Sequence, residues 1–253
     1  MILTDLHIHS KYSDGLLTLA EIVDLYGAAG FDVIAITDHI TSFRNIPGWI
    51  ARKLNLTVTE KNFDVYYRDI MNEKQRAWNK YNMLVIPGFE LSHNTLNFHH
   101  NFHIVALGMS RFVSADQSPK DICAQIADME GASIAAHPVH TGEFEPQTYY
   151  LWENRHELCV EFDAWEAANG KRFFNEVFES GLPMIANSDL HKMEQMSSWR
   201  TVMDANKNEK SVFQAIKNQD LELIYYKYES GRLCYPERSS KEKSLLSLEC
   251  NPA

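Results

Sequence analysis

The stretch MILTDLHIHSKYSDGLLTLAEIVDLYGAAGFDVIAITDH, residues 1–39, decides the fold. Residues 2–6 are an apolar run that predicts a strand. Thr18 and Glu21 form an S/T-x-x-E capping box, which predicts the start of a helix, and a glycine ends that helix. The run FDVIAIT, residues 31–37, is typical of a strand covered on both faces. Strand, helix and strand in this order predict a right-handed βαβ crossover.

Short apolar runs that stop at a histidine or a carboxylate recur along the chain. Examples are VIAITDH, MLVIPGFE, SIAAHP and MIANSDLH, whereas His103 begins such a run, in FHIVALG. Because parallel barrel strands end at one face, where barrel enzymes build their active sites, we expect these side chains to converge. The candidate metal ligands are His7, His9, Asp14, His39, Glu90, His103, His137, Asp189 and His191.

The remaining chain alternates apolar runs with helical patterns. Residues 40–59 lack a steady period and are predicted as a long loop. Helices are predicted near residues 63–81, 120–131, 147–157, 171–181 and 210–218. About seven βα units predict an α/β fold, an open or irregular (β/α) barrel in a single domain. We expect the barrel to occupy residues 1–235, and residues 236–253 to form a charged, serine-rich peripheral tail.

Composition limits the function classes. A chain of 253 residues with 45% hydrophobic and 23% charged residues is typical of a globular protein. The net charge of −10 argues against stable, sequence-independent nucleic-acid binding, which needs a basic face. A phosphorylated substrate stays possible, because bound divalent cations reverse the local field.

The sequence also predicts the compartment. No apolar run approaches the ~18 residues that span a bilayer, and the N-terminus lacks the basic and apolar regions of a signal peptide. The four cysteines, Cys123, Cys159, Cys234 and Cys250, show no CxxC spacing. We therefore expect a reduced, cytoplasmic protein with no membrane partner. The sequence does not indicate an oligomeric state.

Two short motifs favour metal binding. In His7-Ile8-His9, alternate side chains of a strand point the same way, so both imidazoles aim at one point. Asp189 and His191 repeat this alternation. A lone histidine is more often a satisfied core or surface residue, but a set of imidazoles and carboxylates without cysteine is typical of catalytic metal sites.

Other members of the set have simpler interpretations. Asp14 lies in SDG, which is also typical of a turn, and Glu90 could be a solvated loop acid. Asp38, in TDH, could orient a ring or cap a turn. The other histidines of the polar segment before FHIVALG are expected to be solvated: His93, His99 and His100.

These motifs together resemble the PHP (polymerase and histidinol phosphatase) domain family. DLHIHSKYSDG, residues 5–15, resembles its first motif, TDH (37–39) its second, AHP (136–138) its third and SDLH (188–191) its fourth. PGFE and FHIVALG are similar to the intervening glutamate and histidine motifs of the family. The similarity extends from residue 1 to about residue 205.

The resemblance implies a distorted (β/α)7 TIM-like barrel with two or three divalent ions, zinc, manganese or iron, that hydrolyses phosphoesters. Some family members have a histidine at the position of Asp14, which leaves the third metal open. The implied ligand sets are His7, His9, Glu90 and Asp189 for one metal; Glu90, His103 and His137 for a second, with Glu90 bridging; and Asp14, His39 and His191 for a third.

The implied mechanism uses a hydroxide held between metals by Glu90 and Asp189, since paired cations lower the pKa of a bridging water to about 7. Basic groups would stabilise the phosphoryl oxygens. His140 occupies the place of a basic residue in related members. Arg200 follows the last motif, and its alternative is a surface ion pair. Asn169 resembles a family asparagine near the site, and its alternative is a turn.

Three function classes follow from these features. The first is a phosphatase or phosphodiesterase acting on a small phosphorylated metabolite or nucleotide. The second is an amidohydrolase-like C–N hydrolase, which is less favoured because no lysine ends a strand in the metal set. The third is a non-catalytic metal-binding regulatory protein, which would be expected to have lost ligands. Residues 40–60 and 92–101 are expected to shape the pocket, but they do not identify the substrate.

Overall fold

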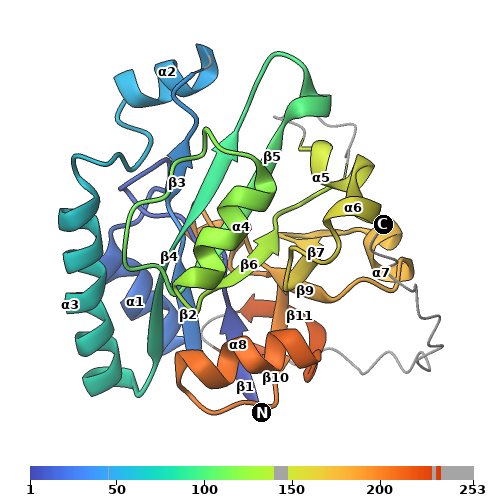
Figure 1. The fold of residues 1–253 in the computed structure, drawn as a ribbon. Helices are drawn as coiled ribbons and strands as arrows, with labels where there is room; N and C mark the ends of the chain where they lie inside the picture. Colours follow the sequence, from blue (N-terminus) through green and yellow to red (C-terminus); the bar gives the residue numbers. More distant parts are fainter. Residues whose placement is uncertain (45, 140–147, 230–231, 235–253) are drawn as a thin grey trace.

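The centre of the protein is one curled sheet with helices on its outer side (Figure 1). The structure is a computed structural model that describes residues 1–44, 46–139, 148–229 and 232–234. Within this part of the chain, twelve strands form the sheet, in the order β12-β11-β10-β1-β2-β4-β5-β6-β7-β8, with β3 paired to β4 and β9 paired to β7.

The strands that build the wall of the curled sheet are β1 (Ile2–Asp5), β2 (Val33–Ile36), β4 (Leu84–His93), β5 (Phe102–Leu107), β6 (Ala132–Ala135), β7 (Ala164–Asn169) and β9 (Met184–Asn187). The shorter or flanking strands are β3 (His39–Thr41), β8 (Arg172–Phe173), β10 (Ser198–Met203), β11 (Leu221–Glu229) and β12 (Arg232–Cys234).

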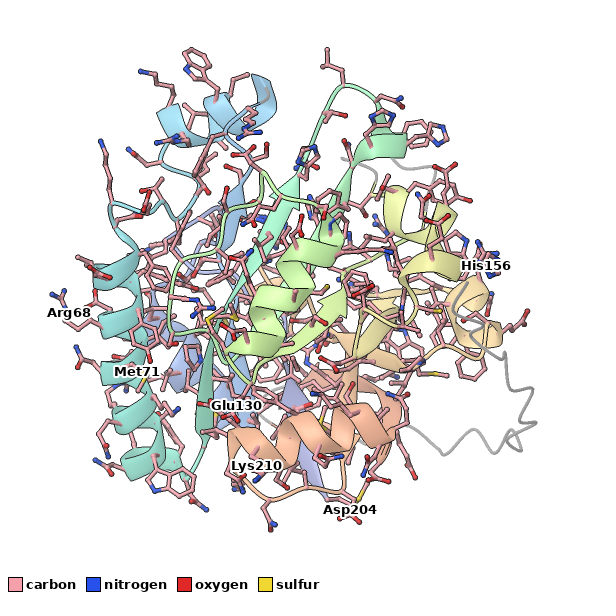
Figure 2. The ribbon with its side chains drawn as sticks, in the orientation of Figure 1. Arg68, Met71, Glu130, His156, Asp204 and Lys210 are labelled. Atoms are coloured by element: carbon pink, nitrogen blue, oxygen red, sulfur yellow. The ribbon has the colours of Figure 1, made fainter. Side chains whose placement is uncertain are left out.

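Helices cover the sheet from several sides (Figure 1). The α-helices are α1 (Leu19–Ala28), α2 (Ile46–Lys53), α3 (Phe63–Tyr81), α4 (Pro119–Asp128), α5 (Tyr150–Glu153), α6 (Arg155–Leu158), α7 (Asn175–Glu179) and α8 (Glu209–Asn218). Two 3₁₀ turns are η1 (Phe98–His100) and η2 (Met193–Gln195). Arg68 projects from the outer side of α3 (Figure 2). No helix among the described residues is long and apolar enough to cross a bilayer.

The predicted first βαβ unit is confirmed. Strands β1 and β2 are parallel, with Thr4 opposite Val33. The capping box of α1 is also present: the Thr18 hydroxyl accepts from the Glu21 backbone N–H at 3.3 Å, and the Glu21 carboxylate accepts from the Thr18 N–H at 2.8 Å. The two reciprocal bonds of the capping box are therefore formed as the sequence predicts.

The mixed α/β fold with a curled sheet agrees with the expected architecture, but the count of seven βα units is not confirmed. Strand β5 runs antiparallel to β4 and β6, and β10 runs antiparallel to β1. The sheet curls far enough for Ile8 to form a parallel bridge with Leu190, and for Leu6 N–H to donate to the Asn187 side chain at 2.9 Å. The end of β1 and the chain after β9 are thereby brought together.

Two local predictions were wrong. Residues 40–59 contain β3 and helix α2 instead of a continuous loop. The Pro47-Gly48 pair at the start of α2 hides its helical pattern, because both residues are poor helix formers. The helix predicted near residues 147–157 is two short helices that meet at Asn154. The predicted tail, residues 236–253, lies outside the described residues.

Alternate residues of the strands face two apolar layers. One layer includes Val33, Val105 and Ile134 and is closed by α8 through Val212. The other lies between the sheet and the helices α1, α3 and α4. Glu90 is paired in register with Val105, so it continues the first layer at the carboxyl end of β4. Along β4, the side chains on this face therefore change from apolar residues in the closed layer to the carboxylate of Glu90.

Candidate metal centre

All nine predicted ligands lie together at one end of the curled sheet. Within the described residues, four overlapping groups have ligand atoms within 4.8 Å of one another. The groups are His9, Asp14, His39 and His191; His7, His137 and Asp189; His7, His9 and Glu90; and Glu90, His103 and His137. The shared members make this one continuous cluster able to bind more than one metal ion.

Glu90 lies at the centre of the cluster and has no exposed surface. Its two carboxylate oxygens are close to ring nitrogens of five histidines. Oε1 lies 2.9 Å from His103, 3.1 Å from His137 and 3.5 Å from His7, and Oε2 lies 2.8 Å from His39 and 3.5 Å from His9. A carboxylate in this position can contact adjacent cations with separate oxygens.

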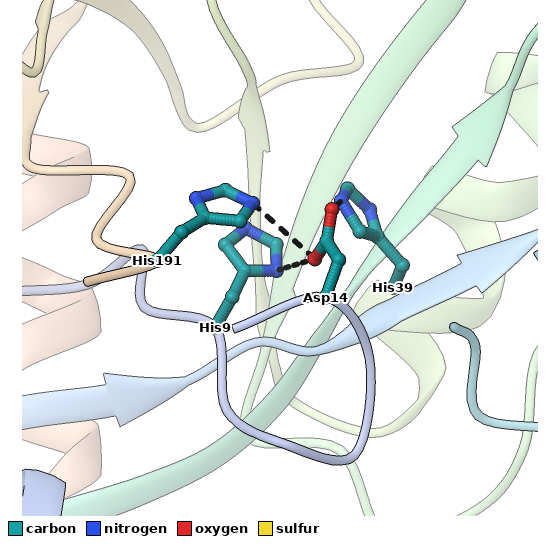
Figure 3. Close-up of side chains that lie close together, drawn as sticks. All are labelled: His9, Asp14, His39 and His191. Carbon is teal, nitrogen blue, oxygen red and sulfur yellow. Dashed lines mark ion pairs between the residues drawn. The ribbon is translucent and has the colours of Figure 1, made fainter. Parts of the chain in front are cut away.

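Asp14 forms the outer end of the cluster (Figure 3). Its carboxylate lies 3.3 Å from His191, 3.5 Å from His39 and 3.9 Å from His9. His9 therefore joins this group, which the family resemblance assigned to the other three residues alone. The third position thus has three imidazoles and one carboxylate available.

The loop that carries Asp14 is fixed by Asp38. The Asp38 carboxylate accepts from the Ser10 N–H at 2.8 Å, the Ser10 hydroxyl at 2.7 Å and the Ser13 hydroxyl at 2.6 Å. A Cβ at Gly15 would lie 2.3 Å from the His9 carbonyl oxygen, so only glycine fits in this turn. Asp38 thus holds the loop rather than orienting a histidine ring.

Several ligand atoms are buried without a hydrogen-bond partner. They are Nε2 of His7, both ring nitrogens of His9, and Oε2 of Glu90. The short contacts of Glu90 Oε2 with His39 and His9 are close enough for ion pairs, but they lack hydrogen-bond geometry. Buried polar atoms normally have partners, and divalent cations between these atoms would supply them. The donor set of imidazoles and carboxylates fits zinc, manganese or iron.

Four of the six ligand histidines are oriented by a second set of side chains. In these four, one ring nitrogen contacts a neighbouring side chain, which fixes the ring relative to the cluster. The contacts are His7 Nδ1 to Glu166 at 2.9 Å, His39 Nδ1 to Ser92 at 2.7 Å, His137 Nδ1 to Thr148 at 3.0 Å and His103 Nε2 to Asn94 at 3.0 Å.

Sequence reasoning missed Glu166, although a signal was present. Glu166 is an acid inside the apolar run FDAWEAAN and is completely buried on β7. A charged residue is almost never fully buried unless it is paired. A carboxylate inside a predicted barrel strand therefore indicates a partner at the site.

The pKa values follow from the mixture of acids and imidazoles. Burial raises the pKa of Glu90, but His103 and His39 outweigh burial and hold this pKa well below its usual value. Burial lowers the pKa of His191, but the carboxylates of Asp189 and Asp14 outweigh it and raise the pKa to about 9. Burial, helped by His191 and His39, lowers the pKa of His9 to about 3. A metal ion must therefore displace protons from some of its ligands.

Two candidate ligands have unusual backbone angles. His137 has φ 28° and Asp189 has φ 52°, in the left-handed region that non-glycine residues seldom adopt. The His137 N–H donates to Glu166 at 2.8 Å, and the N–H of Ser188, just before Asp189, donates to Asp5 at 3.0 Å. Buried carboxylates thus hold both turns, in keeping with the tendency of backbone strain to occur at functional sites.

The structure does not support Arg200 as a substrate contact. Its side chain is fully buried, with Nε 3.1 Å from Asp5 Oδ2 and the guanidinium near the rings of Phe31 and Tyr226. Thr201, the next residue, is in register with Thr4 of β1. Because side chains alternate along a strand, Arg200 faces the helix layer and not the cluster. The alternative prediction, an ion pair at the surface, is also wrong, since Arg200 and Asp5 form a buried pair.

The other two proposed substrate-binding residues have different outcomes. Asn169 is 9% exposed, and its side-chain N–H donates to Glu166 at 2.7 Å. His140 lies outside the described residues. Of the loop histidines, His93 is half-buried and stacks on Phe102, whereas His99 is exposed and contacts Glu153 at 2.8 Å.

Comparison with solved structures gives the fold. A two-domain protein from Bacteroides vulgatus, described as containing a predicted PHP-like metal-dependent phosphoesterase, matches with a TM-score of 0.64 and 20% identity over 88% of this chain. This chain covers only 64% of the length of that protein. PsfC from Pseudomonas syringae matches with a TM-score of 0.55 and 14% identity, covering 88% of this chain and 91% of that one.

Comparison of the sequence gives the family. A search of curated proteins found no match. A family model for a PHP-associated region matches residues 178–221. The PHP domain model matches residues 5–155, more than half of the 253 residues, and this segment carries seven of the nine clustered side chains. The chain therefore belongs to the PHP domain family.

Proposed function

We propose that this protein is a metal-dependent phosphoester hydrolase, a phosphatase or phosphodiesterase that acts on a small phosphorylated metabolite or nucleotide. The observation that carries the proposal is the position of Glu90 between overlapping groups of ligands. Adjacent metal positions that share a carboxylate are suited to hold both the attacking group and the phosphoryl group of one substrate.

The residues of the cluster would have different roles in holding the metal ions. When bound, two or three divalent cations, zinc, manganese or iron, supply an activated water and stabilise charge on the phosphoryl oxygens. Glu90 and Asp189 would hold neighbouring positions together. His7 and His9 would aim their imidazoles at the cluster from fixed positions, since both rings are completely buried.

The burial of Arg200 changes the expected source of positive charge at the site. Without this guanidinium, stabilisation of the phosphoryl oxygens would come mainly from the cations. The family membership and the description of the Bacteroides vulgatus protein support a metal-dependent phosphoesterase, and the absence of a lysine among the nine residues still disfavours a C–N hydrolase.

The test is a substrate screen with controlled metal content. The purified protein is stripped with a chelator, reloaded separately with manganese, zinc or iron, and assayed with phosphomonoesters, phosphodiesters, nucleotides and small amides. We expect phosphate release only after reloading. Equal phosphate release by the metal-free protein, or hydrolysis of amides without any phosphoester, would overturn the proposal.

A further inference from the structure

Glu166 contacts the residues of two metal positions at once. Its Oε1 accepts from His7 Nδ1 at 2.9 Å and from the Asn187 side chain at 3.0 Å. Its Oε2 accepts from the His137 backbone N–H at 2.8 Å and from the Asn169 side chain at 2.7 Å. All four contacts are made by a side chain with no exposed surface, so solvent cannot replace them.

The two histidines that Glu166 contacts each belong to a separate ligand group, and they also share one group with Asp189. His7 is in the group with His9 and Glu90, and His137 is in the group with His103 and Glu90. Their rings lie 5.9 Å apart and are stacked at 20°. Glu166 fixes the ring of His7 through its Nδ1, and it fixes the unusual backbone turn of His137. One carboxylate thus supports two metal positions in different ways.

The Asp14 position is supported separately. Its group shares His9 with the His7 position but contains neither of the two residues that Glu166 contacts. The ring of His39 in this group is held by the Ser92 hydroxyl at 2.7 Å, and the Asp14 loop is held by Asp38. Substitutions of Glu166 and of Ser92 should therefore alter the metal affinity of different positions in the same cluster.

We propose that Glu166 is a positioning residue that sets the metal affinity of the His7 and His137 positions together, and leaves the Asp14 position independent. The inference rests on the proposed metal centre but not on its substrate. A carboxylate that accepts from Nδ1 fixes the tautomer in which Nε2 can bind a metal, and loss of such a partner costs about 10- to 100-fold in metal affinity.

The main variant is Glu166→Gln. A glutamine keeps the volume of the side chain but removes the negative charge that faces both His7 and His137, and its N–H₂ group also deprives one of the two of its acceptor. Ser92→Ala is the matched control, because His39 is the one ligand ring that the Ser92 hydroxyl contacts among the described residues. Asn169→Ala is a milder variant that keeps the carboxylate and removes one of the bonds that orient it.

The measurement is equilibrium dialysis of chelator-treated protein against manganese or zinc, with bound metal counted by mass spectrometry and the Tm recorded for each variant. For Glu166→Gln, we expect the two metal ions at the His7 and His137 positions to bind about 10- to 100-fold more weakly, whereas the affinity of the metal ion at the Asp14 position is unchanged. For Asn169→Ala, the same two equivalents should weaken less. For Ser92→Ala, only the remaining equivalent should weaken.

Several results would overturn the inference. One is wild-type affinity in both Glu166→Gln and Asn169→Ala; if Glu166→Gln does not fold, wild-type affinity in Asn169→Ala alone is sufficient. Another is equal weakening of every equivalent together with a lower Tm, which indicates a general structural role. A wild-type protein that binds no divalent metal would overturn the proposed function itself, so the two failures are distinguishable.

Discussion

Arg200 and Asp5 form a fully buried ion pair between the sheet and its helices, with 3.1 Å between Nε and Oδ2. The same Asp5 carboxylate accepts from the Tyr26 hydroxyl at 2.5 Å and from the Ser188 hydroxyl at 2.6 Å. Since Ser188 directly precedes Asp189, the ion pair helps to hold the chain at a candidate metal ligand. Arg200 therefore contributes to the site through the structure and not by contact with the substrate.

Arg200→Ala should destabilise the protein. Removing one partner leaves the Asp5 charge buried and unpaired, which costs about 3–5 kcal/mol in the free energy of unfolding. Arg200→Lys should cost less, because it keeps the charge but not the planar fork of donors. Urea denaturation of the metal-loaded proteins measures both. A wild-type unfolding curve for Arg200→Ala would contradict this account of the pair.

Glu90→Gln should damage the protein far more than His93→Gln. Glu90 contacts five histidines at the centre of the cluster, whereas His93 stacks on Phe102 outside it. We expect kcat/KM to fall by more than about 100-fold in Glu90→Gln, since loss of an outer partner alone costs about 10- to 100-fold. His93→Gln should remain within a few fold of wild type. Equal kcat/KM values would remove Glu90 from its central role.

Metal should stabilise the folded protein. The unpartnered atoms of His7, His9 and Glu90 are buried in the fold, so cations bind the native state in preference to the unfolded chain. At a free metal concentration of about 100 times Kd, one position adds about 2.7 kcal/mol. The check is the Tm of chelated protein with increasing manganese or zinc, using magnesium as the weaker-binding control. A Tm that does not respond to any of the three would contradict the prediction.

The stability of the metal-free protein should fall in alkaline solution because of His191. Its pKa is about 9 in the fold, above the ordinary value of 6.5. This contribution to stability is therefore fully present below pH 6.5 and is lost as the pH rises to 9. His191→Gln should lower the free energy of unfolding more at about pH 6 than at about pH 9.5. A pH-independent difference between the two proteins would contradict the assignment.

The sequence predicted the first βαβ unit and the convergence of nine side chains because both depend on local pattern. A residue that ends a parallel strand points to the active face wherever that strand lies in the sheet. His103 fits the same rule in reverse. It begins its run because β5 is antiparallel, so the start of β5 lies beside the end of β4.

The remaining features depend on contacts between distant segments. The pairing of Thr201 with Thr4 determines that Arg200 lies on the helix-facing side of the sheet. A shift of one residue in this register would turn Arg200 toward the other side. The role of Glu166 depends on β1 and the end of β6 meeting β7, which no local pattern contains. Such pairings are set by the tertiary fold, so the sequence alone could not distinguish a phosphate contact from a structural ion pair.

The antiparallel pairing of β4 and β5 holds the two strands in place independently of the segment that connects them, residues 94–101. Glu90 and His103 are held by the ladder itself, since Ser92 is opposite His103 and Glu90 is opposite Val105. The tip of this hairpin is outside the ladder, and Leu96 there is 89% exposed. We therefore expect that residues 96–100 can be lengthened, shortened or exchanged while the ladder keeps Glu90 and His103 in place. If this segment borders the proposed site, such a change would alter which substrate enters and would leave the candidate metal ligands as they are.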